Sequence, residues 1–220
     1  MSRKETSNRT TPIIIGSVLL VLFVAFIFVL KYIDVAAIGP GATKVGLATI
    51  NGMFADFVGF NNIFYKLTQL LGYLAILIFI FFAVCGVLQL IKRRSLFKVD
   101  RGLITMGIMF VILLILYIAF DKLAINFRPV LMAGETMPEP SFPSSHTMLA
   151  VCVFGATIIE FRHRLKEGRS YNIIKVMMIC LIVVTVAGRL LSGAHWLTDI
   201  IGGLLISGSL ISFFAAASQE

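Results

Sequence analysis

Charged side chains are scarce in this sequence, because only 14% of its 220 residues are Asp, Glu, Lys or Arg, whereas 59% are hydrophobic. That composition excludes an ordinary water-soluble globular domain. Cysteine is also rare. Cys85, Cys152 and Cys180 lie within apolar runs and form no CxxC pair, so we expect them to be small apolar residues with no disulfide or metal role.

Long apolar runs take the place of the missing charges. A helix needs about 18 or more consecutive apolar residues to cross a bilayer core of roughly 30 Å, and three runs meet that length outright. A fourth run, near the C-terminus, contains no charge, and two shorter runs span only if the polar residues at their ends lie at the membrane surface. The sequence therefore predicts an all-α membrane protein. Its six predicted transmembrane helices are residues 13–30, 70–90, 102–120, 145–161, 173–190 and 197–217.

The distribution of basic residues predicts how these helices are oriented. Thirteen of the 19 Lys and Arg residues lie in the N-terminal segment, in loop 91–101 and in loop 161–175, which share one side of the membrane with the C-terminus. Positive residues concentrate on the cytoplasmic side, so we expect a multi-pass protein of the cell membrane whose other side faces the extracellular space or periplasm. The net charge of +8 then reflects topology rather than a nucleic-acid partner.

Two polar or half-polar segments flank the first helix. Residues 1–11 are predicted to be a disordered cytoplasmic N-terminus, and residues 12–220 one six-span membrane domain. In loop 32–66, aromatic residues recur every third or fourth position from Phe54 to Phe64, which predicts a short helix with an aromatic face. Such a helix lies either in the lipid headgroup region or on the bundle as a folded cap, and the sequence leaves both open.

Three polar clusters lie at the ends of apolar runs, all on the predicted outer side. They comprise residues 122–129, 143–146 and 188–199. In the last cluster, His195 and Asp199 are four residues apart at the start of a helix and therefore share one of its faces. The carboxylate can accept the imidazole Nδ1–H, which leaves Nε2 free as a nucleophile. Arg189 lies six residues before His195, where the preceding helix reaches the surface.

The other two clusters contain residues suited to binding an anion. Ser144 and Ser145 precede a helix whose free N–H groups and dipole attract negative charge, and His146 in its first turn can protonate a departing oxygen. Arg128 can donate two parallel hydrogen bonds to phosphate oxygens, and Lys122 lies six residues before it.

Taken singly, each cluster has an ordinary explanation, as a helix cap or as a basic residue at the membrane surface. Taken together, they supply a nucleophile, an orienting carboxylate, an acid and an anion clamp on the same side of the membrane. The combination predicts a phosphate-handling active site at the outer membrane–water boundary.

In these motifs the chain resembles the type 2 phosphatidic acid phosphatase superfamily, in its integral-membrane lipid phosphatase branch. The pattern of that family is a lysine, six residues and Arg-Pro, then Pro-Ser-Gly-His, then Ser-Arg, five residues, His, three residues and Asp. The residues that match it, in the same order and with the same spacing inside each motif, are Arg128-Pro129, Pro143-Ser144-Ser145-His146, Arg189, His195 and Asp199. The resemblance covers roughly residues 102–214.

The sequence departs from the family pattern at three positions. Ser145 stands where the family has glycine, and Gly188 where it has serine. The position of the family's lysine, with six residues between it and Arg128, is Asp121, and Lys122 follows one residue later. One position on a regular helix rotates a side chain by about 100°, so we expect Lys122 to contribute less than the two arginines.

The resemblance implies a hydrolase for phosphoric esters or diphosphates of lipids. It implies that His195 attacks phosphorus to form a phosphohistidine, that Asp199 orients it, and that His146 protonates the leaving group. The residues that it implies for phosphate binding are Arg128, Arg189, Ser144, Ser145 and Lys122. It implies neither a metal nor another cofactor.

Three lipids are candidate substrates: undecaprenyl diphosphate, phosphatidylglycerol phosphate and phosphatidate. The small size of the protein and the outward orientation of its site favour a role in recycling a prenyl diphosphate in a bacterial cell envelope. The alternative is a non-catalytic lipid-phosphate binder or transporter on the same scaffold, in which the displaced lysine reports lost catalysis.

Overall fold

The computed structural model describes residues 3–132, 134–165 and 168–219. The chain is helical over most of this length, as the apolar runs predict. The elements are α1 (Arg3–Tyr32), β1 (Ala36–Gly39), β2 (Thr43–Val45), α2 (Ala48–Val58), α3 (Asn62–Arg93), α4 (Arg101–Leu123), α5 (Ser145–Leu165), α6 (Arg169–Leu191) and α7 (Leu197–Ala217), with 3-10 turns at Pro40–Ala42 and Leu96–Lys98.

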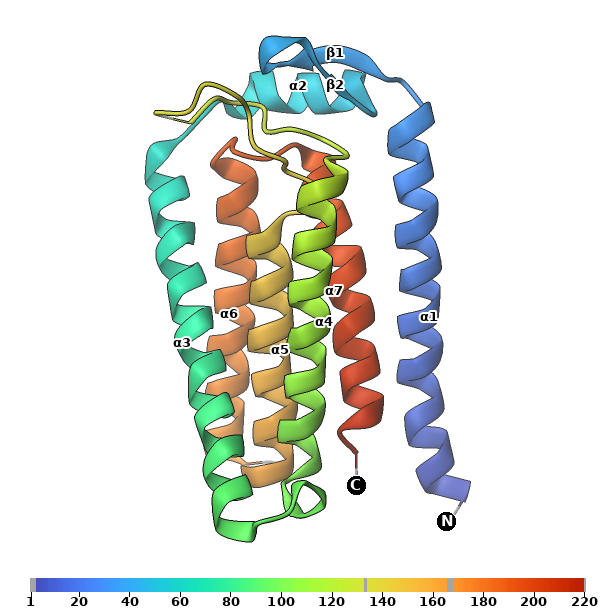
Figure 1. The fold of residues 1–220 in the computed structure, drawn as a ribbon, viewed down its shortest axis with the longest axis vertical. Coiled ribbons are helices and arrows are strands. Elements are labelled where there is room, and N and C mark those ends of the chain that lie inside the picture. The colour runs from blue at the N-terminus through green and yellow to red at the C-terminus, as the bar shows by residue number, and fades with distance from the viewer. Residues whose placement is uncertain (1–2, 133, 166–167, 220) are drawn as a thin grey trace.

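Six long helices, α1 and α3 to α7, run side by side in one bundle (Figure 1). The two ends of the chain lie at the lower end of the bundle in Figure 1, and α2 with the β1–β2 hairpin lies across the upper end. Five of these helices are, within the described residues, long and apolar enough to cross a membrane. They are Arg9–Tyr32, Asn62–Arg93, Arg101–Leu123, Arg169–Leu191 and Leu197–Ala217. The protein is therefore a multi-helix membrane protein.

The sixth long helix, α5, coincides with the predicted span 145–161 but is less apolar. It begins with Ser-His-Thr and carries Glu160 and Arg164 near its other end. Between these polar ends it is packed among other helices, and Cys152, Phe154 and Ala156 are completely buried. A helix enclosed by protein needs fewer lipid-facing apolar side chains than one at the edge of the bundle. The count of six spans stays a prediction.

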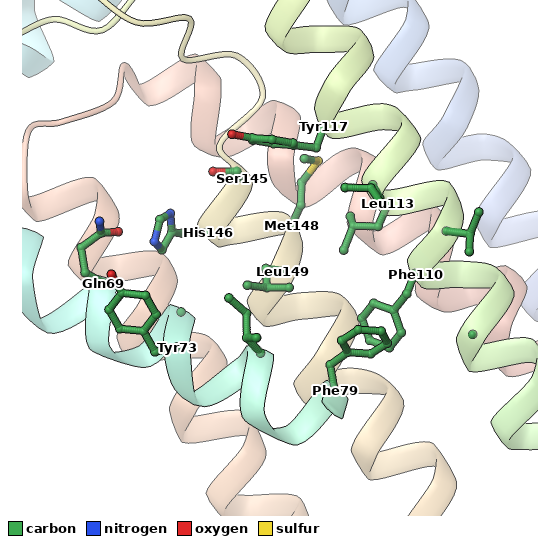
Figure 2. A pocket seen from close by; sticks show the side chains of 15 residues that line it. Gln69, Tyr73, Phe79, Phe110, Leu113, Tyr117, Ser145, His146, Met148 and Leu149 are labelled. Atoms are coloured by element: carbon green, nitrogen blue, oxygen red, sulfur yellow. The ribbon is translucent and has the colours of Figure 1, made fainter. Parts of the chain in front are cut away.

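An apolar groove runs down the bundle between α3, α4 and α5. Its upper part, the upper groove, has a volume of about 520 Å³ and extends from Gln69 and Tyr117 to Phe79 and Phe110. Figure 2 shows this part, with Ser145 and His146 at one end and the Phe79 and Phe110 rings at the other. The lower groove, of about 560 Å³, continues between α3 and α4 toward the lower end.

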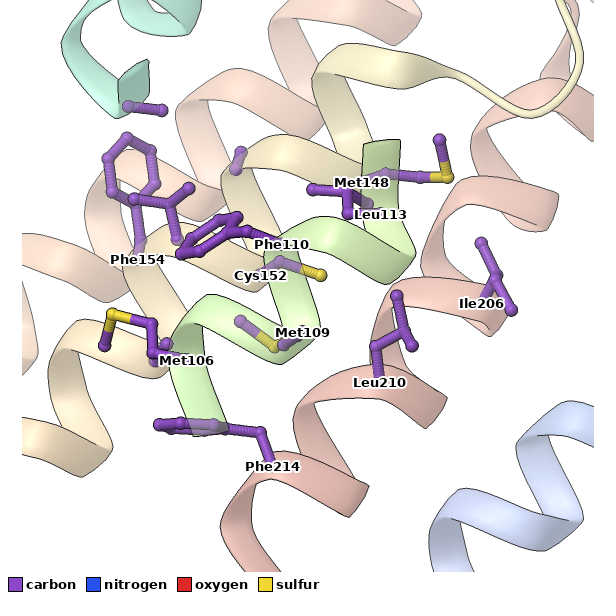
Figure 3. Close-up of a cluster of buried hydrophobic side chains, with 14 of the residues drawn as sticks. Met106, Met109, Phe110, Leu113, Met148, Cys152, Phe154, Ile206, Leu210 and Phe214 are labelled. Atoms are coloured by element: carbon purple, nitrogen blue, oxygen red, sulfur yellow. The ribbon is translucent and has the colours of Figure 1, made fainter. Parts of the chain in front are cut away.

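The buried core lies next to the groove, where α4, α5 and α7 meet, and Phe110 belongs to both. Its side chains are almost all aliphatic, aromatic or sulfur-containing, as Figure 3 shows. The central members are Met106, Met109, Phe110, Leu113, Met148, Cys152, Phe154, Ile206, Leu210 and Phe214. The outward faces of the helices are also apolar, since Val21, Leu70 and Ile115 are each about 60% exposed or more. Large exposed apolar side chains on every outer helix are what a lipid-facing surface requires.

The N-terminal segment differs from its prediction, because α1 already begins at Arg3. The helix therefore covers most of the segment 1–11 for which composition predicts disorder, and residues 1 and 2 lie outside the described residues. Once an apolar helix has formed, each residue added to its end gains a hydrogen bond without a new nucleation cost. A tertiary contact also holds this end, since Arg9 Nη2 donates to the Gln219 carbonyl at 2.7 Å.

A polar network joins three helices at the lower end. Asp100, just before α4, accepts hydrogen bonds from Gln89 at 2.7 Å and Arg93 at 2.9 Å on α3, and from Arg164 at 3.2 Å on α5. The Gln89 hydrogen bond, together with the two arginines, lowers the pKa of Asp100 against the opposing effect of burial. The carboxylate is therefore charged at neutral pH and ties the lower ends of α3, α4 and α5 together.

The upper end is covered by a folded cap, residues 33–61, which contains the β1–β2 hairpin and α2 (Figure 1). The predicted short helix is present as α2, but Gly59 ends it at a φ of 62°, so the aromatic series is divided between α2 and α3. Phe57 is 86% exposed, whereas Asn51 on the opposite face is completely buried. Of the two placements left open by the sequence, the structure shows the folded cap.

Candidate anion site at the upper end of the bundle

The three polar clusters come together at the upper end of the bundle. The first follows α4, the second begins α5, and the third joins α6 to α7. Asp199 links them directly: its backbone carbonyl accepts from the Ser144 N–H at 3.0 Å, and its Oδ1 accepts from Asn126 Nδ2 at 3.2 Å. The predicted convergence of the clusters is therefore present in the fold.

His195 lies beside Asp199, and both side chains are almost fully buried. The distance from His195 Nδ1 to Asp199 Oδ2 is 3.5 Å, which is longer than a usual N–H···O hydrogen bond but has the predicted direction. Burial is the main cause that lowers the pKa of His195, and the positive charges of Arg128 and Arg189 act in the same direction against the Asp199 carboxylate. The imidazole is therefore neutral at pH 7, the form that has a free lone pair.

The first turn of α7 is held from outside its own helix. Within the turn, Asp199 Oδ2 accepts from the Trp196 N–H at 3.0 Å. Asn51 of the cap also holds this turn in place. Its Oδ1 accepts a hydrogen bond from the Thr198 N–H at 3.2 Å, and its Nδ2 donates one to the Thr198 hydroxyl at 2.9 Å. Asn51 thus satisfies a free N–H at the start of a helix 147 residues away in the sequence.

The turn between Arg189 and His195 also depends on the cap. The Asn61 N–H donates to the Ser192 carbonyl at 2.9 Å. Gly193 has a φ of 62°, and a Cβ at this position would lie 2.0 Å from the Gly59 carbonyl oxygen. Only glycine therefore fits between the cap and the site here.

Arg189, at the end of α6, is completely buried and is oriented by two helices. Its Nη2 donates to Gln69 Oε1 on α3 at 2.8 Å and also contacts Nδ1 of His146 on α5. The guanidinium lies over the Tyr65 ring at 5.1 Å from its centroid, a cation–π distance. Because an arginine has no acceptor, the contact makes His146 Nδ1 the acceptor and puts the proton of the neutral ring on Nε2.

Arg128 is oriented by the loop that follows it. Its backbone N–H donates to the Glu139 carbonyl at 2.9 Å, and its Nη2 forms a 2.9 Å ion pair with Glu139 Oε2. The arginine side chain is 13% exposed, whereas that of Glu139 is 47% exposed. The backbone and the carboxylate of one residue thus fix the direction of the guanidinium.

The two arginines share one feature that indicates what they bind. In each, one nitrogen, Nη2, is held by an orienting acceptor, whereas Nε and Nη1 are buried without a hydrogen-bond partner among the described residues. Nε2 of His195 is also buried without a partner, whereas Nδ1 lies 3.5 Å from Asp199 Oδ2. Buried charged donors are costly unless they are satisfied. A tetrahedral oxyanion offers the several acceptor oxygens that would satisfy these donors.

A small cavity of about 110 Å³ is lined by predicted site residues from all three clusters. Arg128, Ser145 and His195 all line it. Ser144 is fully buried behind this wall, where its Oγ accepts from the Thr147 hydroxyl at 3.1 Å. Of the two predicted serines, only Ser145 faces the cavity.

The structure separates Asp121 from Lys122. Both lie in the last turn of α4 and are exposed, but Asp121 lines the cavity beside Arg128 and Lys122 does not. The smaller contribution expected of Lys122 stays a prediction. A carboxylate therefore occupies the place at which the related motif has a lysine.

Three residues that orient the site were not predicted from the sequence: Asn51, Gln69 and Glu139. Each acts from outside the motifs: Asn51 from the cap, Gln69 from the first turns of α3 and Glu139 from the loop before α5. The only signal in the sequence is a polar residue at the predicted membrane boundary, and many such residues are merely solvated. Their roles become visible only when the long-range contacts are known.

We predict that Glu139 acts by positioning Arg128. Glu139→Ala should weaken binding of inorganic phosphate to the purified protein by about tenfold, because the freed guanidinium loses its fixed direction. Glu139→Gln keeps an acceptor and should lose less. Isothermal titration with the three proteins measures this. Tighter binding by Glu139→Ala would show instead that the carboxylate competes with the anion for Arg128.

The comparisons with known proteins agree with the motifs. None of the curated proteins matches the chain. Among solved structures, the chain is similar to the crystal structure of a transmembrane PAP2-type phosphatidylglycerolphosphate phosphatase from Bacillus subtilis, with a TM-score of 0.59 and 16% identity over 92% of this chain and 94% of the other. This likeness shows a common fold. The sequence profile of the PAP2 superfamily matches residues 103–220, and the chain therefore belongs to the PAP2 superfamily.

Proposed function

We propose that the protein is a membrane phosphatase that removes phosphate from a lipid phosphate or diphosphate through a phosphohistidine on His195. The observation that carries this proposal is the set of unpartnered, buried donors of Arg128 and Arg189 close to the neutral His195 imidazole. Membership of the PAP2 superfamily and the printed activity of the structural neighbour support the same conclusion.

In the first step, Nε2 of His195 attacks phosphorus. A P–N bond forms while the P–O bond to the lipid breaks, and the departing oxygen takes a proton from the imidazolium form of His146, which becomes the neutral ring. Water then attacks phosphorus and gives a proton back to His146, and the P–N bond breaks to release phosphate. Throughout, the Nε and Nη1 donors of the two arginines stabilise the charge that develops on the phosphoryl oxygens.

The position of His146 fits the role of an acid for a lipid leaving group. His146 lines the upper groove (Figure 2), and a Cβ on Gly72 of α3 would lie 3.0 Å from its Nε2. The Nε2 proton thus faces the side on which the apolar groove meets the anion site. We propose that the lipid enters sideways from the membrane, with its phosphate at the arginines and its chain in the groove.

The proposed reaction requires no divalent metal. The two arginines supply the positive charge that metal ions provide in two-metal phosphatases. The clusters also contain only two histidines and one committed carboxylate, Asp199, which is a poor ligand set for such a centre.

The proposed site faces the extracellular or periplasmic side of a cell membrane, in a bacterial envelope. The support is the excess of Lys and Arg in the N-terminal segment and in loops 91–101 and 161–175, which lie opposite the anion site. Among the candidate substrates, undecaprenyl diphosphate is the one we favour. The neighbour's printed activity keeps phosphatidylglycerol phosphate in the comparison, and phosphatidate is the third candidate.

A non-catalytic lipid-phosphate binder or transporter is the second candidate function. The observation in its favour is Asp121, which places a carboxylate in the cavity where the family motif has a lysine. A wild-type protein that binds these lipids but releases no phosphate from any of them would establish this alternative.

We predict that His195→Ala lowers phosphate release by at least about a thousandfold, because the covalent step is lost. The assay uses the three candidate lipids with protein purified in detergent. Rapid acid-free quenching of wild-type enzyme with a ³²P-labelled substrate should show a phosphohistidine that is absent from the variant. A well-folded His195→Ala protein with wild-type turnover would refute the mechanism.

We predict that Lys122→Ala costs on the order of tenfold in kcat/KM, about 1.4 kcal/mol, and that Arg128→Ala costs far more. Lys122 is not among the residues that line the cavity, whereas Arg128 is. Asp121→Ala should lower KM, because it removes a negative charge from the phosphate cavity. Equal losses for Lys122→Ala and Arg128→Ala would place the lysine in the site after all.

We predict that Met137→Cys, in a variant whose three native cysteines are replaced, reacts with a membrane-impermeant thiol reagent in intact cells. Met137 is 77% exposed in the loop beside the site. Phe97→Cys is the control at the opposite end, where Phe97 is 99% exposed, and it should react only after lysis. The reverse pattern of labelling would invert the topology.

A further inference from the structure

Asp121 is a charged residue of the small cavity to which the proposed reaction gives no role. It lies in the last turn of α4, and Tyr117 lies one turn earlier on the same helix. Both line the cavity together with Arg128, Ser145 and His195. Residues four positions apart share one face of a helix, so this face of α4 is turned toward the anion site. A carboxylate therefore lies in the cavity in which an arginine and a histidine favour a negative ligand.

The contacts within the fold do not account for this carboxylate. Asp121 makes no hydrogen bond or ion pair with any of the residues that the structure describes. Glu139, which also lines the cavity, differs because its Oε2 is paired with Arg128 Nη2 at 2.9 Å. The end of α4 is also an unfavourable place for a negative charge, because the helix dipole is negative there. The partner available to Asp121 is therefore whatever the cavity binds.

A carboxylate beside a phosphate is stable when one proton lies between them. Two neighbouring acidic groups do not both stay ionised, and the proton that they share is held at higher pH than either group alone would hold it. A P–O–H group can donate a charge-assisted hydrogen bond to a carboxylate. A terminal phosphate has this proton available, because its second pKa is about 6. A phosphodiester and a sulfate have no proton to donate at neutral pH.

The other charged or titratable groups around the phosphoryl group are not free acceptors for such a proton. Arg128 and Arg189 can only donate. The Glu139 carboxylate is paired with Arg128, and the lone pair of His195 is directed at phosphorus in the proposed reaction. Asp121 has both carboxylate oxygens without a partner among the described residues.

We propose that Asp121 is a specificity-determining residue that accepts a hydrogen bond from a protonated oxygen of the phosphoryl group, so that the site selects terminal phosphates and rejects phosphodiesters and sulfate. This inference rests on the proposed function, because it takes the phosphoryl group of the lipid to lie in this cavity. The arginines bind the oxygens that carry negative charge, and Asp121 binds the oxygen that carries the proton.

Such selection matters in a membrane, because the headgroups of common phospholipids are phosphodiesters and surround the protein. An acceptor that a diester cannot satisfy is a repulsive element against these competitors. The three candidate lipids all end in a terminal phosphate and can satisfy it. The lower KM predicted for Asp121→Ala belongs to the same effect, since that variant also accepts the fully ionised phosphate.

The test measures binding of three small anions to the purified full-length protein in detergent, at neutral pH and constant ionic strength. The anions are inorganic phosphate, which has a proton to donate, and sulfate and dimethyl phosphate, which have none. Asp121→Asn removes the negative charge and keeps the shape of the side chain. Asp56→Asn is the matched control, because it makes the same change at an exposed position of α2 that does not line the cavity. Size-exclusion chromatography and thermal unfolding check that both variants fold.

Isothermal titration of the wild type should show phosphate bound at least about tenfold more tightly than either other anion, the difference expected from one hydrogen bond to a charged group. Asp121→Asn should bind sulfate about tenfold more tightly than the wild type does, and so lose most of this preference. Asp56→Asn should behave as the wild type. Inhibition of phosphate release by sulfate, which should be stronger in Asp121→Asn by the same factor, repeats the comparison in the working enzyme.

The inference is wrong if the wild type has no preference for phosphate, or if Asp121→Asn keeps the wild-type preference. Phosphate release from the candidate lipids, measured on the same proteins, separates this failure from that of the proposed function. Release without the anion preference overturns the role of Asp121 alone. Preference without release supports the role of Asp121 and overturns catalysis. A wild type that neither binds phosphate nor releases it overturns both.

Discussion

Asp199 is the residue on which the arrangement of the site depends. Its carboxylate accepts from the Trp196 backbone and from Asn126, and it lies beside His195. Its carbonyl receives the N–H of Ser144. One residue therefore connects the segment after α4, the start of α5 and the start of α7. A buried carboxylate is tolerated only when several donors surround it, and here the donors that satisfy it are contributed by the segments that must converge.

The two arginines are buried positive charges, and acceptors hold them as donors hold the Asp199 carboxylate. Each guanidinium has one nitrogen fixed by an acceptor, whereas its Nε and Nη1 are buried without a hydrogen-bond partner among the described residues. The fixed contact removes rotational freedom in advance, so less entropy is lost when an anion binds. The cavity also contains Asp121 and Glu139, and these carboxylates offset part of the positive charge. The balance of charge, and not only the number of arginines, therefore sets how strongly the cavity attracts an anion.

The helices and most motif residues were predictable from the sequence because both rest on local patterns. Apolar runs gave the long helices, and the His195–Asp199 spacing gave a shared helix face. Other features depend on contacts between distant segments. The helical start of α1 is supported by the Arg9 contact with Gln219, and the orientation of Arg189 by Gln69, 120 residues away. The different fates of Ser144 and Ser145 could not be predicted either, because neighbouring residues at a helix start have similar chemistry and only packing decides which one faces the cavity.

The trans-capping contact of Asn51 has a consequence for biosynthesis. A ribosome makes the cap early and α7 last, and the partners Asn51 and Thr198 are separated by 147 positions. Until α7 has entered the membrane, Asn51 has no helix start to cap. The contacts that Asp199 makes with Ser144 and Asn126 have not yet formed either. Any translation intermediate that stops before α7 thus contains both arginines but lacks Thr198 and Asp199, the residues through which the cap and the three polar clusters are joined. The polar clusters therefore converge in one step, when α7 takes its place in the bundle.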